Sequence, residues 1–305
     1  MIARPRRSVL YMPGSNPRAI AKARSLAADA IILDLEDSVA PEAKAAARGQ
    51  VAAAAREGGF GGRELIIRIN GVDSPWGRED LAAAIAAAPD AILLPKIDGP
   101  GAVMHVAREL REAGAPAQIR LWAMMETPMA ILHAGSIAAV AADPDSRLDV
   151  MVMGLNDLAK ETRARFVPGR ASMTAWLALC VAAARAHGVD ILDGVYNDIA
   201  DLKGFEAECT QGRDMGLDGK TLIHPSQIDI ANAVFAPTSA EVGGAQAIIA
   251  AFSLPENSGK GAIQLDGRMV ERLHAEMARR TLSIAQGIAA LSLTAGAPSP
   301  ALEPR

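Results

Sequence analysis

The chain has 305 residues, of which half are apolar and 22% are charged, and its formal net charge is -4. This composition supports a large core and argues against global disorder. The acidic balance argues against nucleic acid as a partner, because phosphate binding needs a broad basic surface. The two cysteines, Cys180 and Cys209, fit a reducing compartment. The sequence shows neither a signal-peptide pattern nor an apolar run of about 18 residues, so we expect a cytoplasmic protein without a membrane partner.

Eight short apolar runs, separated by Ala-rich segments of helical composition, predict eight strands. Most of these runs are continuous rather than alternating, which favours strands covered on both faces. They are residues 8–11, 30–35, 65–70, 91–95, 119–125, 148–154, 191–195 and 220–224. Eightfold strand–helix alternation predicts an α/β fold, a (β/α)8 TIM barrel.

A doubly wound open sheet is the main alternative fold. That fold needs a glycine-rich turn after the first strand, where a dinucleotide phosphate binds. Here the turn reads Met-Pro-Gly-Ser-Asn over 12–16 and contains a single glycine, Gly14. The dinucleotide fingerprint is absent, so we favour the barrel.

The composition changes after Pro237. We predict a helix over 239–251, a loop over 255–261 and helical structure over 266–287. From about 294 the chain is rich in Ala, Pro and Ser, and we expect a frayed tail. We therefore divide the chain into a catalytic barrel over 1–237 and a C-terminal helical arm over 238–305. Because the arm is too short to fold alone, we expect it to dock on its own barrel or at a subunit interface.

Two carboxylates occupy equivalent places in consecutive strand–helix units. Glu126 ends the fifth run, and Asp157 follows the sixth. The carboxyl ends of barrel strands face one mouth, where functional groups gather. Magnesium binds a few carboxylate oxygens and keeps other positions for water or substrate. The pair predicts a metal site, although each residue alone could cap the helix that follows it.

An arginine in an apolar strand needs a partner, because an isolated buried charge costs several kcal/mol. Arg68 lies in the third run, so it either pairs with Asp34 or Glu36 or points into the mouth. There its planar guanidinium would bind a carboxylate or an enolate oxygen. Glu36, with Asp37 beside it, is predicted to hold a metal-bound water or Arg68.

Seven motifs in order resemble the citrate lyase β-subunit and malyl-CoA lyase branch of the HpcH/HpaI aldolase superfamily. They are RSVLYMPGSN (7–16), LDLEDSV (33–39), IRING (67–71), LPK (94–96), METP (125–128), GLNDL (154–158) and KTLIHP (220–225). The resemblance covers about residues 7–280. It implies a magnesium-dependent (β/α)8 barrel, commonly trimeric, that makes or breaks a C–C bond beside a CoA or acyl-carrier thioester.

The resemblance also implies roles for individual residues. Glu126 and Asp157 match the metal ligands, and Arg68 matches the substrate-binding arginine. The basic residues Arg6, Arg7, Arg18 and Lys22 resemble the region that meets the nucleotide part of CoA; a solvated basic face is the other interpretation. Glu271, in GRMVE (267–271), stands where family members usually carry an Asp that enters a neighbour's active site. The longer side chain would shift the reacting geometry.

Together these features predict a Mg2+-dependent carbon–carbon lyase that acts on citryl-CoA, malyl-CoA or a similar 3-hydroxyacyl thioester. Glu126 and Asp157 would hold the metal with the oxo-acid half, so that Glu126 also meets substrate. Arg68 would offset enolate charge, and Glu271 of another subunit would act as catalytic acid. Hydrolysis of the thioester or a malate-synthase-like reaction on the same site is the second interpretation. A non-catalytic subunit of a lyase complex is the third.

Overall fold

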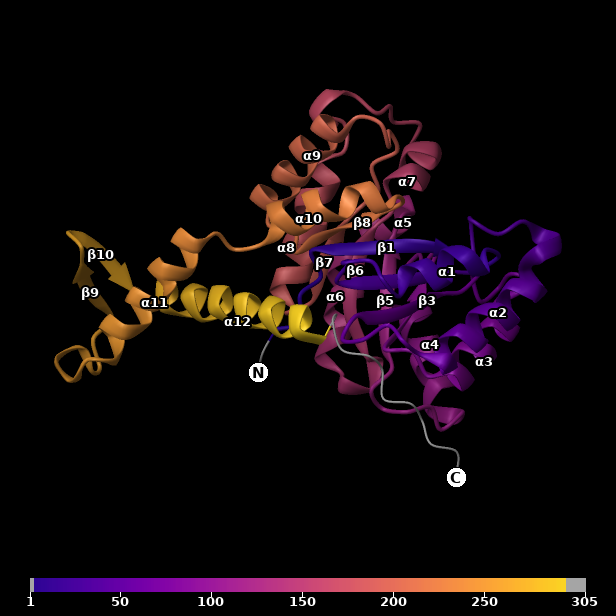
Figure 1. The fold of residues 1–305 in the computed structure, drawn as a ribbon, viewed down its shortest axis with the longest axis horizontal. Helices are drawn as coiled ribbons and strands as arrows, with labels where there is room; N and C mark the ends of the chain where they lie inside the picture. The colour runs from indigo at the N-terminus through magenta and orange to yellow at the C-terminus, as the bar shows by residue number, and fades with distance from the viewer. Residues whose placement is uncertain (1–2, 295–305) are drawn as a thin grey trace. The chain divides into compact units, whose positions relative to one another are not determined.

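A computed structural model of the chain describes residues 3–294, and its main feature is a closed barrel of eight parallel strands (Figure 1). The strands follow chain order around the barrel, and β1 pairs with β8 to close it. They are β1 (Ser8–Pro13), β2 (Ala30–Asp34), β3 (Glu64–Arg68), β4 (Ala91–Leu94), β5 (Arg120–Met125), β6 (Leu148–Met153), β7 (Asp190–Asp193) and β8 (Gly219–Leu222). The predicted (β/α)8 fold is confirmed, and each strand begins within one residue of its predicted start.

Helices surround the barrel strands (Figure 1). They are α1 (Pro17–Ala23), α2 (Lys44–Glu57), α3 (Gly77–Ala87), α4 (Pro100–Glu112), α5 (Pro128–Leu132), α6 (Ala134–Ala139), α7 (Leu155–Thr162), α8 (Thr174–Ala186), α9 (Leu202–Met215) and α10 (Ile228–Phe235). Local chemistry sets several helix starts at the carboxyl ends of strands. The Asn16 side chain accepts a hydrogen bond from the Ala19 N–H at the start of α1, and Thr127 accepts one from Ala130 in α5. These caps fix where each loop leaves the barrel rim.

The strands bury apolar side chains on both faces, as their continuous apolar runs predict. Inside the barrel, Ile32, Ile66, Trp122 and Val152 belong to one buried cluster. The outward-facing residues, with Leu33 as an example, pack with the helices in a second and larger cluster. This two-sided packing holds the strand ends, and hence the residues that follow them, in fixed positions.

Arg6 occupies the amino end of the barrel, which we call the floor. Its guanidinium lies 2.8 Å from Glu64, 2.5 Å from Asp149 and 2.7 Å from Asp190. These acids stand at or next to the first residues of β3, β6 and β7. The guanidinium carbon also lies 5.3 Å from the centroid of the Trp122 ring. Burial disfavours the charged form of Arg6, but the three carboxylates outweigh it and raise its pKa.

The described residues divide into two compact units, residues 6–235 and residues 236–294 with 3–5. The second unit contains α11 (Ser239–Ser253), a hairpin of β9 (Ala262–Leu265) and β10 (Arg268–Glu271), and α12 (Arg272–Thr294). The hairpin replaces the first part of the helix predicted over 266–287. Asp266 and Gly267 both have positive φ in its two-residue turn, a conformation that suits a tight hairpin.

Docking of this C-terminal segment at a subunit interface stays a prediction, as does the proposed division at 237. The predicted frayed tail lies outside the described residues, apart from its first member, Thr294. Within residues 3–294, none of the helices has the length and apolarity needed to cross a membrane.

Candidate active site

The carboxyl ends of the strands surround a cavity of about 290 Å³, which we call the mouth cavity. Side chains from the ends of seven strands, or from the loops that follow, line it, and most of the polar ones are charged. The lining includes Tyr11, Asp34, Asp37, Arg68, Glu126, Asn156, Asp157 and Thr221. The structure thus brings together five of the predicted site residues, Arg68, Glu126, Asp157, Asp37 and, through its contact with Arg68, Glu36.

Arg68 is buried at the end of β3 and is held by two acids from the end of β2. Its Nε donates to Asp34 Oδ1 over 2.6 Å and its Nη2 to Asp34 Oδ2 over 2.7 Å. Its Nη1 lies 2.8 Å from Glu36 Oε2. Both interpretations of the sequence therefore apply, because Arg68 forms a structural ion pair and also lines the cavity. The bidentate contact fixes the plane of the guanidinium.

Charge pairing controls the ionisation of Asp34. Burial acts to raise its pKa, but Arg68 and the hydrogen bonds from Ser38 and Glu36 outweigh burial and hold the pKa below its usual value. Arg68, in turn, has a pKa raised by the Asp34 charge against the effect of burial. This pair is a permanent ion pair around neutral pH.

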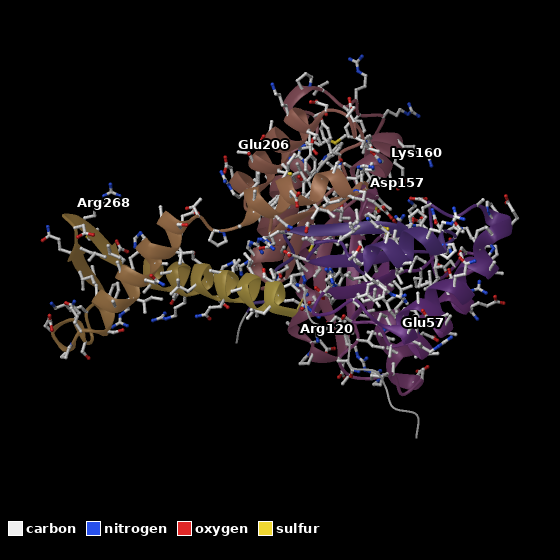
Figure 2. All side chains as sticks on the ribbon, viewed as in Figure 1. Glu57, Arg120, Asp157, Lys160, Glu206 and Arg268 are labelled. Carbon is white, nitrogen blue, oxygen red and sulfur yellow. The ribbon has the colours of Figure 1, made fainter. Side chains whose placement is uncertain are left out.

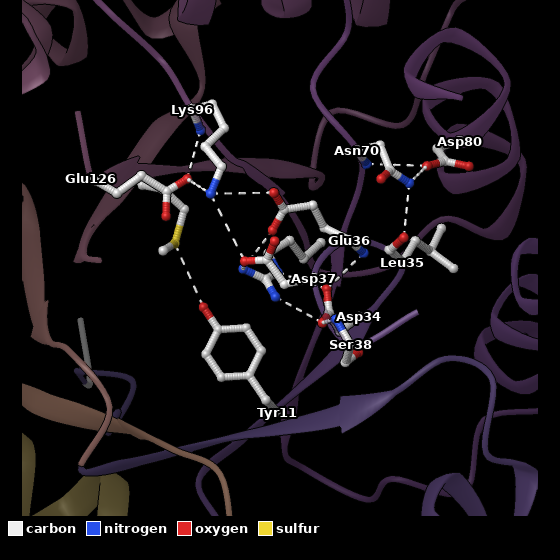
Figure 3. A network of polar contacts seen from close by, with 12 residues as sticks. Tyr11, Asp34, Leu35, Glu36, Asp37, Ser38, Asn70, Asp80, Lys96 and Glu126 are labelled. Carbon is white, nitrogen blue, oxygen red and sulfur yellow. Dashed lines mark hydrogen bonds and ion pairs between the residues drawn. The ribbon is translucent and has the colours of Figure 1, made fainter. Parts of the chain in front are cut away.

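Glu126 and Asp157 converge on the ammonium group of Lys96 (Figure 3 shows the Glu126 side). Lys96 Nζ lies 2.5 Å from Asp157 Oδ2 and 3.7 Å from Glu126 Oε1. The Lys96 backbone N–H also donates to Glu126 Oε1 over 2.7 Å. Asp157 lies in the first turn of α7, one turn before Lys160 (Figure 2). The two predicted metal ligands therefore lie close together, and both are near the Lys96 ammonium group.

Glu126 and Glu36 both have raised pKa values. Burial raises the pKa of Glu126 to about 7, with a further contribution from the Glu36 charge and an opposing one from Lys96. Burial likewise raises the pKa of Glu36 to about 7; Arg68 opposes this rise and Asp37 adds to it. Both carboxyls therefore have pKa values near neutral pH mainly because they are buried, and the neighbouring carboxylates add to the rise.

The residues present fit a divalent cation. Five carboxylates meet at the mouth (Asp34, Glu36, Asp37, Glu126 and Asp157) against two basic side chains, Arg68 and Lys96, which leaves three negative charges when all are ionised. Among residues 3–294 no group of three His, Cys, Asp or Glu side chains forms a complete metal cage. Magnesium suits a site with two carboxylate ligands, where water or substrate fills the other coordination positions.

Gly154 leaves the space that Glu126 occupies. A Cβ atom at position 154 would lie 2.4 Å from Glu126 Cβ and 2.6 Å from Glu126 Oε2. Both distances are well inside van der Waals contact. The glycine of the GLNDL motif is therefore needed for the position of the preceding strand's carboxylate.

Sequence reasoning gave no role to two residues of this site, Lys96 and Tyr11. Lys96 stands in the LPK motif after β4, and its left-handed backbone (φ 51) is not visible in a sequence. Tyr11 stands in the first motif, in a strand of continuous apolar character. Whether the Tyr11 side chain faces the barrel interior or the helices depends on the pairing of β1 with its neighbouring strands.

The predicted CoA contacts fall into two groups. Arg7 lies just before β1, at the floor end of that strand, where its guanidinium binds the buried Asp29 over 2.7 and 2.8 Å. Arg6 is enclosed in the floor itself. The structure thus does not place these two at the mouth, because they precede the strand rather than follow it. Arg18 and Lys22 are exposed on α1, whose amino end lies at the mouth, and they remain candidates.

Glu271 lies at the end of β10 in the C-terminal unit. Its backbone N–H donates to His274 Nδ1 over 3.0 Å. It is not part of the residue cluster within the barrel unit, so its predicted role in a neighbouring subunit stays a prediction.

The barrel and its acidic mouth place the chain among the (β/α)8 enzymes. The HpcH/HpaI aldolase/citrate lyase family matches residues 7–225, and the chain belongs to this family, as the motifs predicted. A (3S)-malyl-CoA thioesterase of Cereibacter sphaeroides (strain KD131 / KCTC 12085) is 51% identical over 94% of this chain and 97% of the relative. An L-malyl-CoA/beta-methylmalyl-CoA lyase of Rhodobacter capsulatus is 34% identical over 88% of this chain and 91% of the relative.

Among solved structures, the chain is similar to the protein CitE from Mycobacterium tuberculosis in complex with magnesium, acetoacetate and coenzyme A. The TM-score is 0.72 with 28% identity, over 94% of this chain and 100% of that chain.

These comparisons correct the expected carbon–carbon lyase activity. Relatives named (3S)-malyl-CoA thioesterase are 50% to 51% identical to this chain, whereas those named lyases are 33% to 34% identical. The prediction was wrong because the motifs that suggested a lyase identify the family, to which relatives named thioesterase and relatives named lyase both show similarity. Binding of an acyl-CoA does not determine which bond breaks.

Proposed function

We propose that this protein hydrolyses the thioester bond of a 3-hydroxyacyl-CoA, with (3S)-malyl-CoA as the substrate. The observation that carries the proposal is the 51% identity to (3S)-malyl-CoA thioesterases over nearly the whole of both chains. The mouth cavity supports the proposal, since a cavity of about 290 Å³ lined by the Arg68 guanidinium suits a small acyl group that carries a carboxylate. The products would be malate and free CoA.

The proposed cofactor is Mg2+, held by Glu126 and Asp157. When bound there, it supplies Lewis acidity to oxygen atoms of the acyl group. The three excess negative charges of the mouth support this assignment, as does Gly154, which lets Glu126 occupy its position. So does the magnesium bound in the related CitE structures.

In this proposal Arg68 binds the acyl group as a fixed positive charge. Asp34 holds it bidentately, so the charge is oriented before substrate arrives, and little reorganisation is needed. Glu36 is suited to accept a proton from the attacking water, because its pKa of about 7 lets it exchange protons near neutral pH. Asp37, 3.5 Å from Arg68 Nη1, supports the same arginine.

Three further assignments extend the proposal to the rest of the chain. Arg18 and Lys22 would contact the nucleotide part of CoA through exposed positive charge on α1. The chain would form a homo-oligomer, and Glu271 of a neighbouring copy would supply an acidic group to the mouth. Light scattering tests the oligomer, and inhibition of hydrolysis by free CoA, compared between wild type and Arg18→Gln, tests the α1 contact.

The deciding experiment incubates purified protein with Mg2+ and (3S)-malyl-CoA and follows free thiol, malate and glyoxylate. Thiol and malate in equal amounts without glyoxylate are expected. Glyoxylate without free thiol would show that the carbon–carbon bond breaks instead, and no product would favour a non-catalytic subunit. The protein's own thiols will not interfere, because Cys180 and Cys209 are buried and burial raises the pKa of each to about 12.

A further inference from the structure

Tyr11 directs its side chain into the mouth cavity from β1, beneath Arg68. The guanidinium carbon of Arg68 lies 4.8 Å from the centroid of the Tyr11 ring, so the ring supports the arginine from below. Tyr11 also lines the cavity directly. A phenylalanine ring at position 11 would support Arg68 equally well. The hydroxyl group of Tyr11 is therefore the part of the side chain that this packing does not explain.

The hydroxyl group of Tyr11 has a weak partner. Within the described residues, its recorded hydrogen bond goes to Met124 Sδ over 3.6 Å, and a thioether is a poor acceptor (Figure 3). Tyr196 provides the contrast, since its hydroxyl donates to Asp201 Oδ2 over 2.8 Å. Tyr11 is half-buried, and a tyrosine hydroxyl group enclosed to this degree normally finds a strong partner. Tyr11 therefore holds a donor that is available to a ligand in the cavity.

The surroundings keep this donor protonated. Burial raises the pKa of Tyr11 above its ordinary value, and Asp34, Glu126 and Glu36 add to the rise against the effect of Arg68. A neutral phenol can donate a hydrogen bond but cannot act as a base here. A suitable partner is an acceptor oxygen of the ligand, and the hydrogen bond from a neutral phenol becomes stronger when that oxygen gains negative charge.

We propose that the Tyr11 hydroxyl group donates a hydrogen bond to the thioester carbonyl oxygen as that oxygen becomes an oxyanion. This inference rests on the proposed hydrolysis and assigns a residue to its electrostatic part. Water adds to the thioester carbon, its proton passes to the base, and the C=O π pair moves onto oxygen. On collapse the C–O double bond re-forms, and the C–S bonding pair leaves with sulfur, which takes up a proton as free CoA. Tyr11 keeps its own proton throughout.

The two tyrosines of the chain give a matched pair of variants, Tyr11→Phe and Tyr196→Phe. Each removes one hydroxyl group and keeps the ring. Loss of a single donor to an oxyanion lowers kcat about 100-fold or more in well-studied sites. We expect Tyr11→Phe to lower kcat for (3S)-malyl-CoA hydrolysis by about 100-fold or more with little change in KM, and Tyr196→Phe to leave kcat unchanged. Full kcat in Tyr11→Phe, with wild type active, would overturn the inference.

A binding measurement tests Tyr11 separately from hydrolysis. In malate the former thioester carbonyl has become a carboxylate, so one of its oxygens carries the charge that Tyr11 is proposed to meet. Calorimetry with malate and Mg2+ should show about tenfold weaker binding to Tyr11→Phe than to wild type. Equal affinity would reject the role of Tyr11 even in a protein that hydrolyses nothing. An inactive wild type whose malate affinity depends on Tyr11 would reject only the proposed hydrolysis. Thermal melting of both variants verifies that each is folded.

Discussion

Lys96 and Glu126 are joined through both the backbone and the side chain of the lysine. The Lys96 N–H donates to Glu126 Oε1 over 2.7 Å, while Lys96 Nζ lies 3.7 Å from the same oxygen. This double contact occurs with a positive φ of 51° at Lys96, which residues with a Cβ adopt uncommonly. Since Nζ is also 2.5 Å from Asp157 Oδ2, one strained residue orients both predicted metal ligands.

Replacing Lys96 by methionine should destabilise the metal-free protein. Five carboxylates would then face a single cation, Arg68, although the partial exposure of Lys96 limits the loss to about 1 kcal/mol. Magnesium should restore the lost stability, so its addition should raise Tm more in Lys96→Met than in wild type. Thermal melts in EDTA and in Mg2+ measure both effects, with the exposed Lys160→Met as control. Equal melting of Lys96→Met and wild type in EDTA would contradict this account.

Replacing Glu126 by glutamine should weaken Mg2+ binding by about 100-fold or more, because an amide oxygen lacks the charge of the carboxylate that a metal prefers. The fold should persist, since glutamine keeps an oxygen able to accept the Lys96 N–H. Calorimetric titration with Mg2+ provides the measurement. Glu109→Gln, on the exposed face of α4, should bind Mg2+ like wild type. Unchanged affinity in Glu126→Gln would remove Glu126 from the metal site.

Replacing Gly154 by alanine should impair the site through contact alone. The added Cβ would fall 2.4 Å from Glu126 Cβ and must displace that side chain. We expect at least a tenfold loss of Mg2+ affinity and a lower Tm, as overpacking costs about 1–3 kcal/mol. Gly135→Ala in α6 is the matched control, because nothing lies within 4 Å of its added Cβ. A Gly154→Ala protein with normal metal affinity would show that the site can relax.

The stabilisation by magnesium should increase with pH. The pKa values of Glu36 and Glu126 are raised to about 7 from 4.5, so these groups favour folding most at low pH. The metal-free protein loses that contribution as pH rises from about 4.5 to about 7. A cation favours the ionised carboxylates, so the rise in Tm caused by Mg2+ should be small near pH 5.5 and large near pH 8. A pH-independent rise would show that neither carboxyl is protonated in this range.

Replacing Arg6 by leucine should destabilise the fold by about 3–5 kcal/mol, because three acids of the floor would lose their shared partner. Since Arg6 is at the opposite end of the strands, kcat of the remaining folded protein should stay close to wild type. Chemical denaturation and steady-state kinetics together check this. The exposed pair of Arg111 with Asp145 gives the control, where Arg111→Leu should cost less than about 1 kcal/mol.

The strands could be predicted well because continuous apolar runs have one explanation in a barrel, burial on both faces. The hairpin of β9 and β10 was missed, since four-residue strands such as Arg268–Glu271 carry too little pattern to separate from a helix. Charged residues at strand ends marked the mouth, whereas Arg7 precedes β1 and was assigned to CoA from the family resemblance rather than from its place beside the strand. The direction of Tyr11 and the φ of Lys96 depend on tertiary structure. The reaction could not be predicted because the motifs identify a family to which relatives named thioesterase and relatives named lyase are both similar.

The floor and the mouth differ in how far their acidic side chains are neutralised, and this difference has a practical consequence for evolution and engineering. At the floor, Arg6 satisfies its three acids, whereas the mouth keeps an excess of negative charge for a ligand to neutralise. Residues that stabilise the fold and residues that bind the ligand thus lie at opposite ends of the same strands. Thermostable variants should be sought by redesigning the floor, and new substrate preferences by changing the loops at the mouth, with little interference between the two efforts.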